Sequence, residues 1–207
     1  MLLDHAEDDF WKSPSSYLPA DRMPIFLRDA SSSDLPAITA IYRESVLNGV
    51  ASYEIVPPDE SEMAARFSAI TGQSYPYIAA IDENGGLLGY AYASAFRTRP
   101  AYRWMVEDSI YLGPEARGKG IGRLLLAELI QRCTDLGFRQ MVAVIGGAHP
   151  ASIALHQTLG FAETGRLKAT GYKHGRWLDT MIMQRALGDG AATDPDASTY
   201  PGTLFKA

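Results

Sequence analysis

Hydrophobic residues recur with two different periods along the chain, and their order predicts a mixed α/β sheet. Residues 24–30 are typical of a strand, and residues 31–49 of a helix that polar residues open and Asn48-Gly49 closes. A second helix follows residues 57–61. Two β-rich runs around Asn84-Gly85-Gly86, within residues 75–96, predict an antiparallel hairpin.

The second half of the chain continues the alternation of strands and helices. Residues 105–113 predict a strand, and a helix follows that ends at Gly137. Its apolar positions are Ile121, Leu124, Leu125, Ile130 and Cys133. Residues 139–147 are almost continuously apolar, which predicts a strand buried on both faces. A short helix over 150–161 and two strands within 162–187, joined around His174-Gly175, complete a mixed sheet covered by helices.

The two ends of the chain differ in composition from its middle. Residues 1–22 are acidic and contain two prolines, whereas residues 188–207 are rich in small and turn-forming residues. We therefore expect an N-terminal extension over 1–22, a single domain over 23–187 and a C-terminal tail over 188–207. Phe10, Trp11 and Tyr17 suggest the alternative that the extension docks on a surface.

Charge and cysteine content narrow the class of protein. A formal net charge of -5 and a pI of about 5.4 argue against binding to a nucleic-acid backbone. No apolar run approaches the roughly 20 residues that a membrane span needs. The single cysteine, Cys133, cannot form an internal disulfide and falls on the apolar side of a helix, so we expect it in the core. We expect a cytoplasmic protein with neither nucleic acid nor membrane as a partner.

The stretch EARGKGIGRLLLAEL, residues 115–129, joins a glycine-rich turn to the start of a helix. Such a turn leaves several backbone N–H groups unpaired at the positive end of the helix dipole, an arrangement that binds phosphate. It is not a P-loop, since Ile121 follows Gly120, and Arg123 breaks the dinucleotide pattern G-x-G-x-x-G. The alternative is a turn that merely connects two elements.

The sequence RGKGIG, residues 117–122, matches the Q/R-x-x-G-x-G/A signature of the GNAT superfamily of N-acyltransferases. Together with VAVIGGAHPASIALHQTLGF and ATGYKHGRWLD, the chain resembles the phosphinothricin N-acetyltransferase branch of that superfamily, from about residue 23 to residue 185. The resemblance implies a GNAT-like α/β fold. This fold has a mixed, mostly antiparallel twisted sheet with helices on both faces and a splayed central strand pair.

The resemblance also implies acetyl-CoA as the acetyl donor. The backbone of the strand before the loop would contact the pantetheine arm, and the loop would hold the pyrophosphate. The residues implied in binding it are Ile110, Tyr111, Leu112, Arg117, Gly118, Lys119, Gly120, Ile121, Gly122, Arg123 and His149. His149 departs from the asparagine usual in the family. An imidazole replaces one amide hydrogen bond but not both a donor and an acceptor.

Glu107 is the candidate general base, which an ammonium acceptor requires at neutral pH. Alternation places it on one side of its strand with Met105, Ser109 and Tyr111, where a carboxylate is expected to have a raised pKa. The resembling branch has glutamate at this position. A glutamate on an exposed strand surface is the alternative, and Asp108, on the opposite side, is a weaker candidate base.

His156 lies where many members of the superfamily have a tyrosine thought to protonate the coenzyme thiolate. We expect it to act as that acid or to orient the base. The alternative is a structural histidine on a short apolar helix.

The segment FRTRPAYRW, residues 96–104, mixes cations with aromatics just before the strand of Glu107. Arg97 or Arg99 is expected to pair with a substrate carboxylate, while Phe96 and Tyr102 form a wall. A solvated surface loop is the alternative. Residues 171–177 either line the site or a dimer interface, or form only a tight turn. In the family, the substrate-facing loop corresponds to Tyr53 and Glu54.

The expected activity is transfer of an acetyl group from acetyl-CoA to the amino group of a small amino-acid-like acceptor, by direct attack in a ternary complex. Phosphinothricin, methionine sulfoximine and methionine sulfone are acceptors of this type. Another amine (a polyamine, an antibiotic or a protein N-terminus) and a catalytically silent acyl-CoA-binding module are the alternatives. Members of the branch are commonly homodimers, so we expect a homodimer, and we assign no metal site.

Overall fold

The computed structural model describes residues 24–202, and its elements follow the predicted order. The strands are β1 (Phe26–Asp29), β2 (Tyr77–Ile81), β3 (Leu87–Ala95), β4 (Met105–Leu112), β5 (Gln140–Gly146), β6 (Ala162–Lys173) and β7 (Arg176–Ala186). The α-helices are α1 (Leu35–Asn48), α2 (Glu60–Thr71), α3 (Ile121–Asp135) and α4 (Pro150–Thr158). The expected N-terminal extension, with Phe10, Trp11 and Tyr17, lies outside the described residues.

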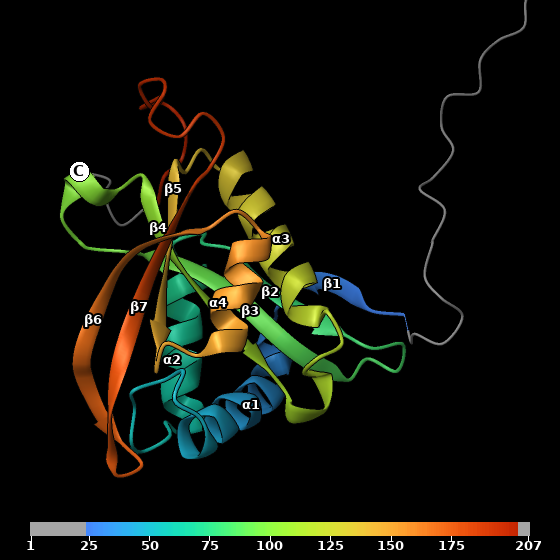
Figure 1. Cartoon of the computed structure of the whole chain (residues 1–207). Coiled ribbons are helices and arrows are strands. Elements are labelled where there is room, and N and C mark those ends of the chain that lie inside the picture. The colour runs from blue at the N-terminus through green and yellow to red at the C-terminus, as the bar shows by residue number, and fades with distance from the viewer. Residues whose placement is uncertain (1–23, 203–207) are drawn as a thin grey trace, which may run out of the picture.

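The strands form one sheet in the order β1-β2-β3-β4-β5-β7-β6, with β1 and β6 at opposite edges (Figure 1). All neighbouring pairs are antiparallel except β4 and β5, which run parallel. The mixed, mostly antiparallel sheet that the resemblance implied is therefore confirmed.

The two parallel strands separate after a short contact. β4 pairs with β5 only from Met105, opposite Gln140, to Glu107, opposite Val142. Beyond Glu107, β4 stays paired with β3 as far as Leu112, and β5 stays paired with β7 as far as Gly146. A V-shaped gap thus opens between β4 and β5, with Glu107 at its closed end.

The gap corrects one expectation for β5. Its near-continuous apolar sequence predicted burial on both faces, but Val144 is 40% exposed. The reason is that β4 has already diverged at this point, so no neighbouring strand covers that side chain.

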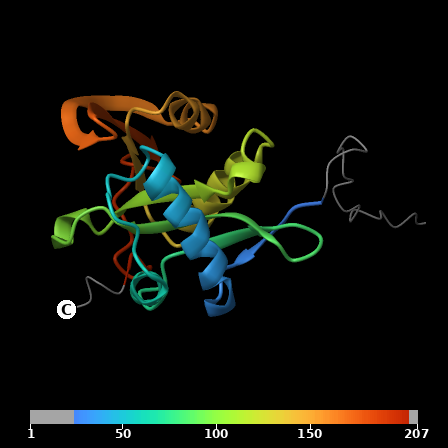
Figure 2. The same cartoon turned by 90° about the horizontal axis from the view of Figure 1, so that it is seen from below.

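Helices cover both faces of the sheet (Figures 1 and 2). Alternation along β4 separates the faces: Tyr111 packs edge-on against Tyr42 of α1, whereas Asp108 contacts His156 of α4. The core is correspondingly divided into two clusters. One centres on α1, α2 and the tyrosines of β2 and β3, and the larger one centres on α3.

Helix α3 packs against the middle of the sheet through a continuous buried stripe. The stripe consists of Ile121, Gly122, Leu125, Leu126, Leu129, Ile130 and Cys133. It faces small side chains such as Ala91 and Ala93, which allow close approach. Each buried leucine contributes roughly 1.5–3 kcal/mol. Leu124, expected on this face, is instead 45% exposed because it points away from the stripe.

The segment 188–202, expected to be a tail, packs back on the domain as far as it is described. The Tyr200 ring lies 5.8 Å from Phe138 and 6.3 Å from Tyr75, both edge-on. Pro201 and Gly202 are buried. Separately, none of the helices within residues 24–202 has the length and apolar content needed to cross a membrane.

Candidate active site

The glycine-rich turn between β4 and α3 has a backbone that only glycine adopts easily. Gly118 has φ +73° and Gly120, at the helix N-cap, has φ +82°. A Cβ atom added to Gly118 would meet nothing within 4 Å, so this side of the turn is open. The turn therefore presents main chain rather than side chains at the start of α3.

The backbone N–H groups of this turn fit a diphosphate. Across the described part of the chain, the five consecutive N–H groups of residues 118–122 have no hydrogen-bond partner. They stand at the N-terminus of a 15-residue helix, where the helix dipole favours negative charge. The loop thus offers an oxyanion several donors at once, as the sequence predicted.

The three basic residues of the loop have different surroundings. Arg117 forms an ion pair with Glu44 of α1 and also donates a 3.4 Å hydrogen bond to the carbonyl of Leu112. Lys119 and Arg123 are exposed and make no ion pair with any residue in the range 24–202. Two cations are therefore available to an anionic ligand, while the third is largely neutralised.

A second helix begins at the same end of the gap. Because β4 and β5 are parallel, the turns after both strands lie at one edge of the sheet, and α4 begins at Pro150 just after β5. His149 is the N-cap of α4, and its exposed imidazole makes no hydrogen bond to any described residue. Gly122 lets the two helices approach: an added Cβ would lie 3.3 Å from the Leu155 side chain.

Glu107 lies at the closed end of the gap, on the face that α1 and α2 cover. Burial raises its pKa, the negative charge of Asp108 adds to this effect, and the positive charge of Arg97 opposes it. The direction agrees with the expectation for a general base. Val142, its partner on β5, and Val144 share this face of the sheet.

Asp108 and His156 form a buried pair on the opposite face. His156 Nε2 lies 3.1 Å from Asp108 Oδ2, and His156 Nδ1 lies 2.7 Å from the carbonyl oxygen of Ser152. Burial lowers the pKa of His156, but Asp108 and the Ser152 carbonyl outweigh it, so the pKa lies above its usual value. Both ring nitrogens are engaged, and Asp108 Oδ1 is buried without a hydrogen-bond partner among residues 24–202.

The predicted substrate segment is only partly brought to Glu107. The Phe96 and Tyr102 rings pack edge-on 5.8 Å apart, and the Arg97 guanidinium lies over Phe96, 4.3 Å from the ring centre. The influence of Arg97 on Glu107 places this cation within electrostatic reach of the base. Arg99 is exposed at the start of a 3-10 turn, and among residues 24–202 Arg97 is the cation whose charge acts on Glu107.

A polar group lies on the same face as Glu107, and sequence reasoning anticipated only Glu54 of it, through the substrate-facing loop of the family. Arg66 of α2 binds Glu54 at 2.7 Å, and Glu54 in turn accepts a 3.1 Å hydrogen bond from Tyr42. These residues adjoin a small cavity lined by Tyr42, Met63, Arg66, Ile70, Tyr77, Tyr90 and Tyr92. The partners of Glu54, Tyr42 and Arg66, were not anticipated, because no local pattern links α1 and α2 to this loop.

The gap, the turn with unpaired N–H groups and the carboxylate of raised pKa fit an acyltransferase that uses a phosphate-bearing coenzyme. The model of the Acetyltransferase (GNAT) domain family matches residues 27–182, and the chain belongs to that family. It is an N-acetyltransferase, and the family uses acetyl-CoA as the acetyl donor.

Characterised relatives and solved structures agree with this assignment. The chain is 48% identical to phosphinothricin N-acetyltransferase of Alcaligenes faecalis over 171 aligned residues. The alignment covers 82% of this chain and 86% of that protein. The chain is 42% identical over 162 residues to an L-methionine sulfoximine/L-methionine sulfone acetyltransferase of Pseudomonas paraeruginosa, covering 78% and 94%. The crystal structure of a phosphinothricin acetyltransferase from Sinorhizobium meliloti with acetyl-CoA matches with a TM-score of 0.87 and 68% identity, covering 89% and 100%.

Proposed function

We propose that this enzyme acetylates the α-amino group of a small amino-acid-like acceptor of the phosphinothricin, methionine sulfoximine or methionine sulfone type. The observation that carries the proposal is Glu107, a carboxylate of raised pKa at the closed end of a gap. The open end of this gap presents five N–H groups that have no hydrogen-bond partner among residues 24–202. The acceptors named for relatives at 48% and 42% identity support the substrate class.

Residues on both sides of the gap would hold the coenzyme. The N–H groups of residues 118–122 would bind the pyrophosphate, with Lys119 and Arg123 adding charge. The backbone of Ile110, Tyr111 and Leu112 would run beside the pantetheine arm, since β4 has no partner on its β5 side there. His149 would contribute at the start of α4. When bound, acetyl-CoA supplies a thioester activated for transfer to an amine.

Glu107 acts as the general base in this proposal. The acceptor arrives as an ammonium ion at neutral pH, and Glu107 takes one proton from it directly or through a water molecule. A raised pKa makes the carboxylate a stronger base for this proton transfer. The amine is then free to attack in a ternary complex.

His156 serves this proposal as a positioning residue. Its two nitrogens bind Asp108 and the Ser152 carbonyl, and its ring packs edge-on against Phe161 at 4.9 Å. The pair holds β4 against α4 immediately beside Glu107. We therefore favour the orienting role over proton donation to the coenzyme.

Arg97 would bind the carboxylate of the acceptor. It is exposed, and its charge already acts on Glu107, so a carboxylate paired with it would bring the neighbouring α-amino group toward the base. Phe96 and Tyr102 would line the apolar part of the acceptor. Arg99, exposed in the same segment, is a second candidate.

An acceptor screen tests the substrate class. Purified enzyme and acetyl-CoA are incubated with single amines, and the acetylated products are measured by mass spectrometry. We expect phosphinothricin, methionine sulfoximine or methionine sulfone to be acetylated, with an Arg97→Gln variant raising the acceptor KM about tenfold or more. An Arg43→Gln variant, at an exposed site on α1, is the control.

Two outcomes would contradict the proposal. Activity confined to cationic polyamines would assign the enzyme to a different acceptor class. Tight coenzyme binding without any acetylated product across the panel would indicate a catalytically silent module.

We also propose that the enzyme is a cytoplasmic homodimer. The hairpin tip of β6 and β7 carries Tyr172 and Trp177, which are 59% and 66% exposed and pack edge-on at 5.3 Å. Exposed aromatic pairs of this kind are typical of interfaces. Sedimentation should give a dimer that Trp177→Glu converts to a monomer, while Phe26→Glu at the other sheet edge has no effect. A wild-type monomer at micromolar concentration would contradict the proposal.

A further inference from the structure

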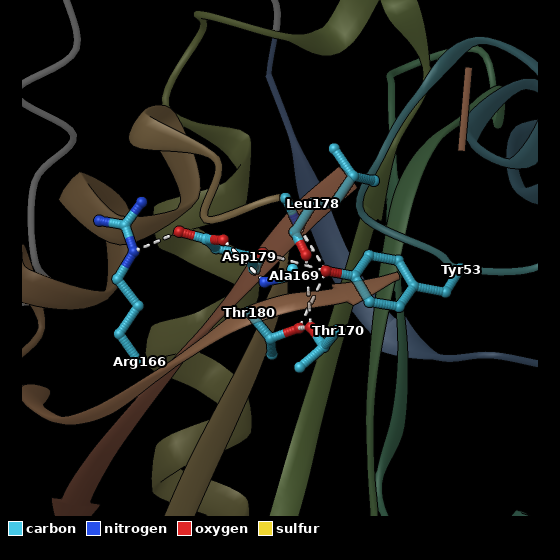
Figure 3. A network of polar contacts seen from close by, with 8 residues as sticks. Tyr53, Arg166, Ala169, Thr170, Leu178, Asp179 and Thr180 are labelled. Carbon is cyan, nitrogen blue, oxygen red and sulfur yellow. Dashed lines mark hydrogen bonds and ion pairs between the residues drawn. The ribbon is translucent and has the colours of Figure 1, made fainter. Parts of the chain in front are cut away.

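The hydroxyl of Tyr53 joins three segments that are far apart in the sequence. Tyr53 belongs to the loop between α1 and α2, and its hydroxyl oxygen lies 2.9 Å from Thr180 Oγ1 and 3.0 Å from the Asp179 carbonyl of β7 (Figure 3). The same oxygen accepts a 3.2 Å hydrogen bond from the N–H of Gly147, just after β5. One side chain therefore ties this loop to the end of the splayed strand.

Strand β6 is deformed where it receives Tyr53. Three residues, 168–170, stand opposite the single residue Asp179, because Leu167 pairs with Thr180 and Gly171 with Leu178. The Asp179 carboxylate supports this bulge: it accepts a 3.0 Å bond from the N–H of Ala169, which has φ +52°, and a 2.9 Å bond from Arg166 (Figure 3). The bulge is thus held by its own ion pair.

The ring of Tyr53 fits against β6 only because position 171 is glycine. A Cβ atom there would lie 2.7 Å from Tyr53 Cε2, which is closer than real Cβ contacts. The loop backbone also lies directly on the end of β5, since a Cβ on Gly146 would be 2.6 Å from the carbonyl oxygen of Ala51. Both close approaches place the loop on the β5 side of the gap.

The residues on either side of Tyr53 face the opposite wall of the gap. Ser52 Oγ and Glu54 Oε1 lie 3.2 Å and 3.1 Å from the Tyr42 hydroxyl. Tyr42 packs edge-on against Tyr111 of β4, with ring centres 5.0 Å apart. Residues 50–54, which we call the strap, therefore span the gap from the β4 side to the β5 side on the face where Glu107 lies.

We propose that the Tyr53 hydroxyl is a positioning group for the acceptor: it holds the strap across the gap so that the acceptor amine is confined beside Glu107. The inference rests on the proposed function. Tyr53 takes no part in the chemistry, since its hydroxyl is bonded to Gly147, Asp179 and Thr180. Without that hydroxyl, acceptor binding must also order the strap, which costs free energy and weakens acceptor binding. The turn at the start of α3, proposed to bind the coenzyme, is not changed.

A Tyr53→Phe variant tests this role because it keeps the ring and removes only the hydroxyl. The acceptor is the amine that the wild-type enzyme acetylates best in the screen. We expect the acceptor KM to rise about tenfold, with kcat and the Kd for acetyl-CoA each within about twofold of wild type. Thr164→Val is the matched control, since it removes one hydroxyl that bonds the Ile182 carbonyl at 3.2 Å in the same hairpin. The control should leave all three constants unchanged.

Gly171→Ala provides a second, independent variant. It keeps the hydroxyl but displaces the ring, so the same split between acceptor KM and coenzyme Kd is expected. This variant also decides the question if Tyr53→Phe fails to fold.

Two results would overturn the inference. A Tyr53→Phe enzyme indistinguishable from Thr164→Val would remove any positioning role, and equal losses in acceptor and coenzyme affinity would indicate a general structural effect. Failure of the proposed function is separate: the wild-type enzyme would then acetylate none of the amino-acid analogues in the screen.

Discussion

Glu107 owes its proposed chemistry to its position rather than to its type. A glutamate on an exposed strand is an ordinary acid, but at the closed end of the gap burial and Asp108 raise its pKa. Arg97 limits the shift by supplying a nearby positive charge. The same cation is our candidate for binding the acceptor carboxylate, so acceptor binding would also neutralise the charge that acidifies Glu107.

A Glu107→Gln variant should lose kcat by about 10²- to 10⁴-fold, the usual contribution of a general base. The Kd for acetyl-CoA should be unchanged, because the substitution leaves the turn proposed to bind the pyrophosphate intact. In the wild-type enzyme, kcat/KM should fall as the pH drops through the raised pKa of Glu107, since protonation removes the base. Steady-state kinetics across pH measure both effects, with exposed Glu163→Gln as control. A variant with wild-type kcat would exclude Glu107 as the base.

A substitution at Gly118 tests two separate effects, one of backbone strain on stability and one of the turn on coenzyme affinity. Gly118 has a φ of +73°, which disfavours alanine, and its open surroundings exclude a clash. Gly118→Ala should therefore lower the free energy of unfolding by about 1 kcal/mol and raise the Kd for acetyl-CoA about tenfold.

Gly85→Ala is the matched control for that substitution. Gly85 has φ +82° and equally open surroundings, but it lies in the turn between β2 and β3. It should show the same loss of stability by denaturation and no change in coenzyme Kd by calorimetry. Equal weakening of coenzyme binding in both variants would contradict the assignment of the loop.

At the scale of elements, β4 connects the two halves of the site. Its alternation points Glu107 and Tyr111 toward α1 and α2, and Asp108 toward α3 and α4. Burial raises the pKa of Glu107 and that of Cys133 on α3, and the Asp108 charge adds to both effects, so it acts on both faces. The strand therefore links the proposed base to the packing of two helices.

The Asp108–His156 pair should make stability depend on pH. Because the folded-state pKa of His156 is raised, the stabilisation is fully present below the unfolded value of about 6.5 and is lost as pH rises through the folded value. His156→Asn should abolish this fall and destabilise the fold by about 3 kcal/mol, since it leaves Asp108 buried and unpaired. Thermal melts from pH 5 to 9 measure the stability of both proteins as a function of pH. A melt profile of the same shape for wild type and variant would contradict the pairing, and exposed His174→Asn is the control.

At the scale of the whole molecule, the segment after β7 helps to close the larger core. Tyr200 covers the stacked rings of Tyr75 and Phe138, which are 5.8 Å apart, and Gly137 turns the chain beside it with φ +91°. The Tyr200 hydroxyl also donates a hydrogen bond to the Gln73 carbonyl. The domain thus depends on residues beyond the last strand.

Tyr200→Ala should lower the free energy of unfolding by about 2 kcal/mol, the usual contribution of a largely buried aromatic side chain. Chemical denaturation measures the loss. Val56→Ala, at a position 77% exposed, should change it by less than about 0.5 kcal/mol. Equal stability of the two variants would show that the segment is dispensable for the fold.

The sequence by itself determined the elements and the glycine-rich turn to which we assign coenzyme binding. Periodicity located the strands and helices because side-chain alternation depends only on near neighbours, and the glycines of residues 118–122 defined the turn because positive φ is a local requirement. The family signature added the splayed strand pair. The face on which Glu107 lies was also predictable, since it follows from side-chain alternation along β4.

Only the tertiary structure decided how distant segments meet. Val144 is exposed because β4 diverges from β5, which the sequence of β5 cannot record. Tyr53 bonds Thr180, 127 residues away, and His156 pairs with Asp108, 48 residues away. Such contacts depend on strand order and on a bulge in β6, and no local pattern encodes them. They hold the strap and the buried pair in place, whereas local sequence specifies the elements they join.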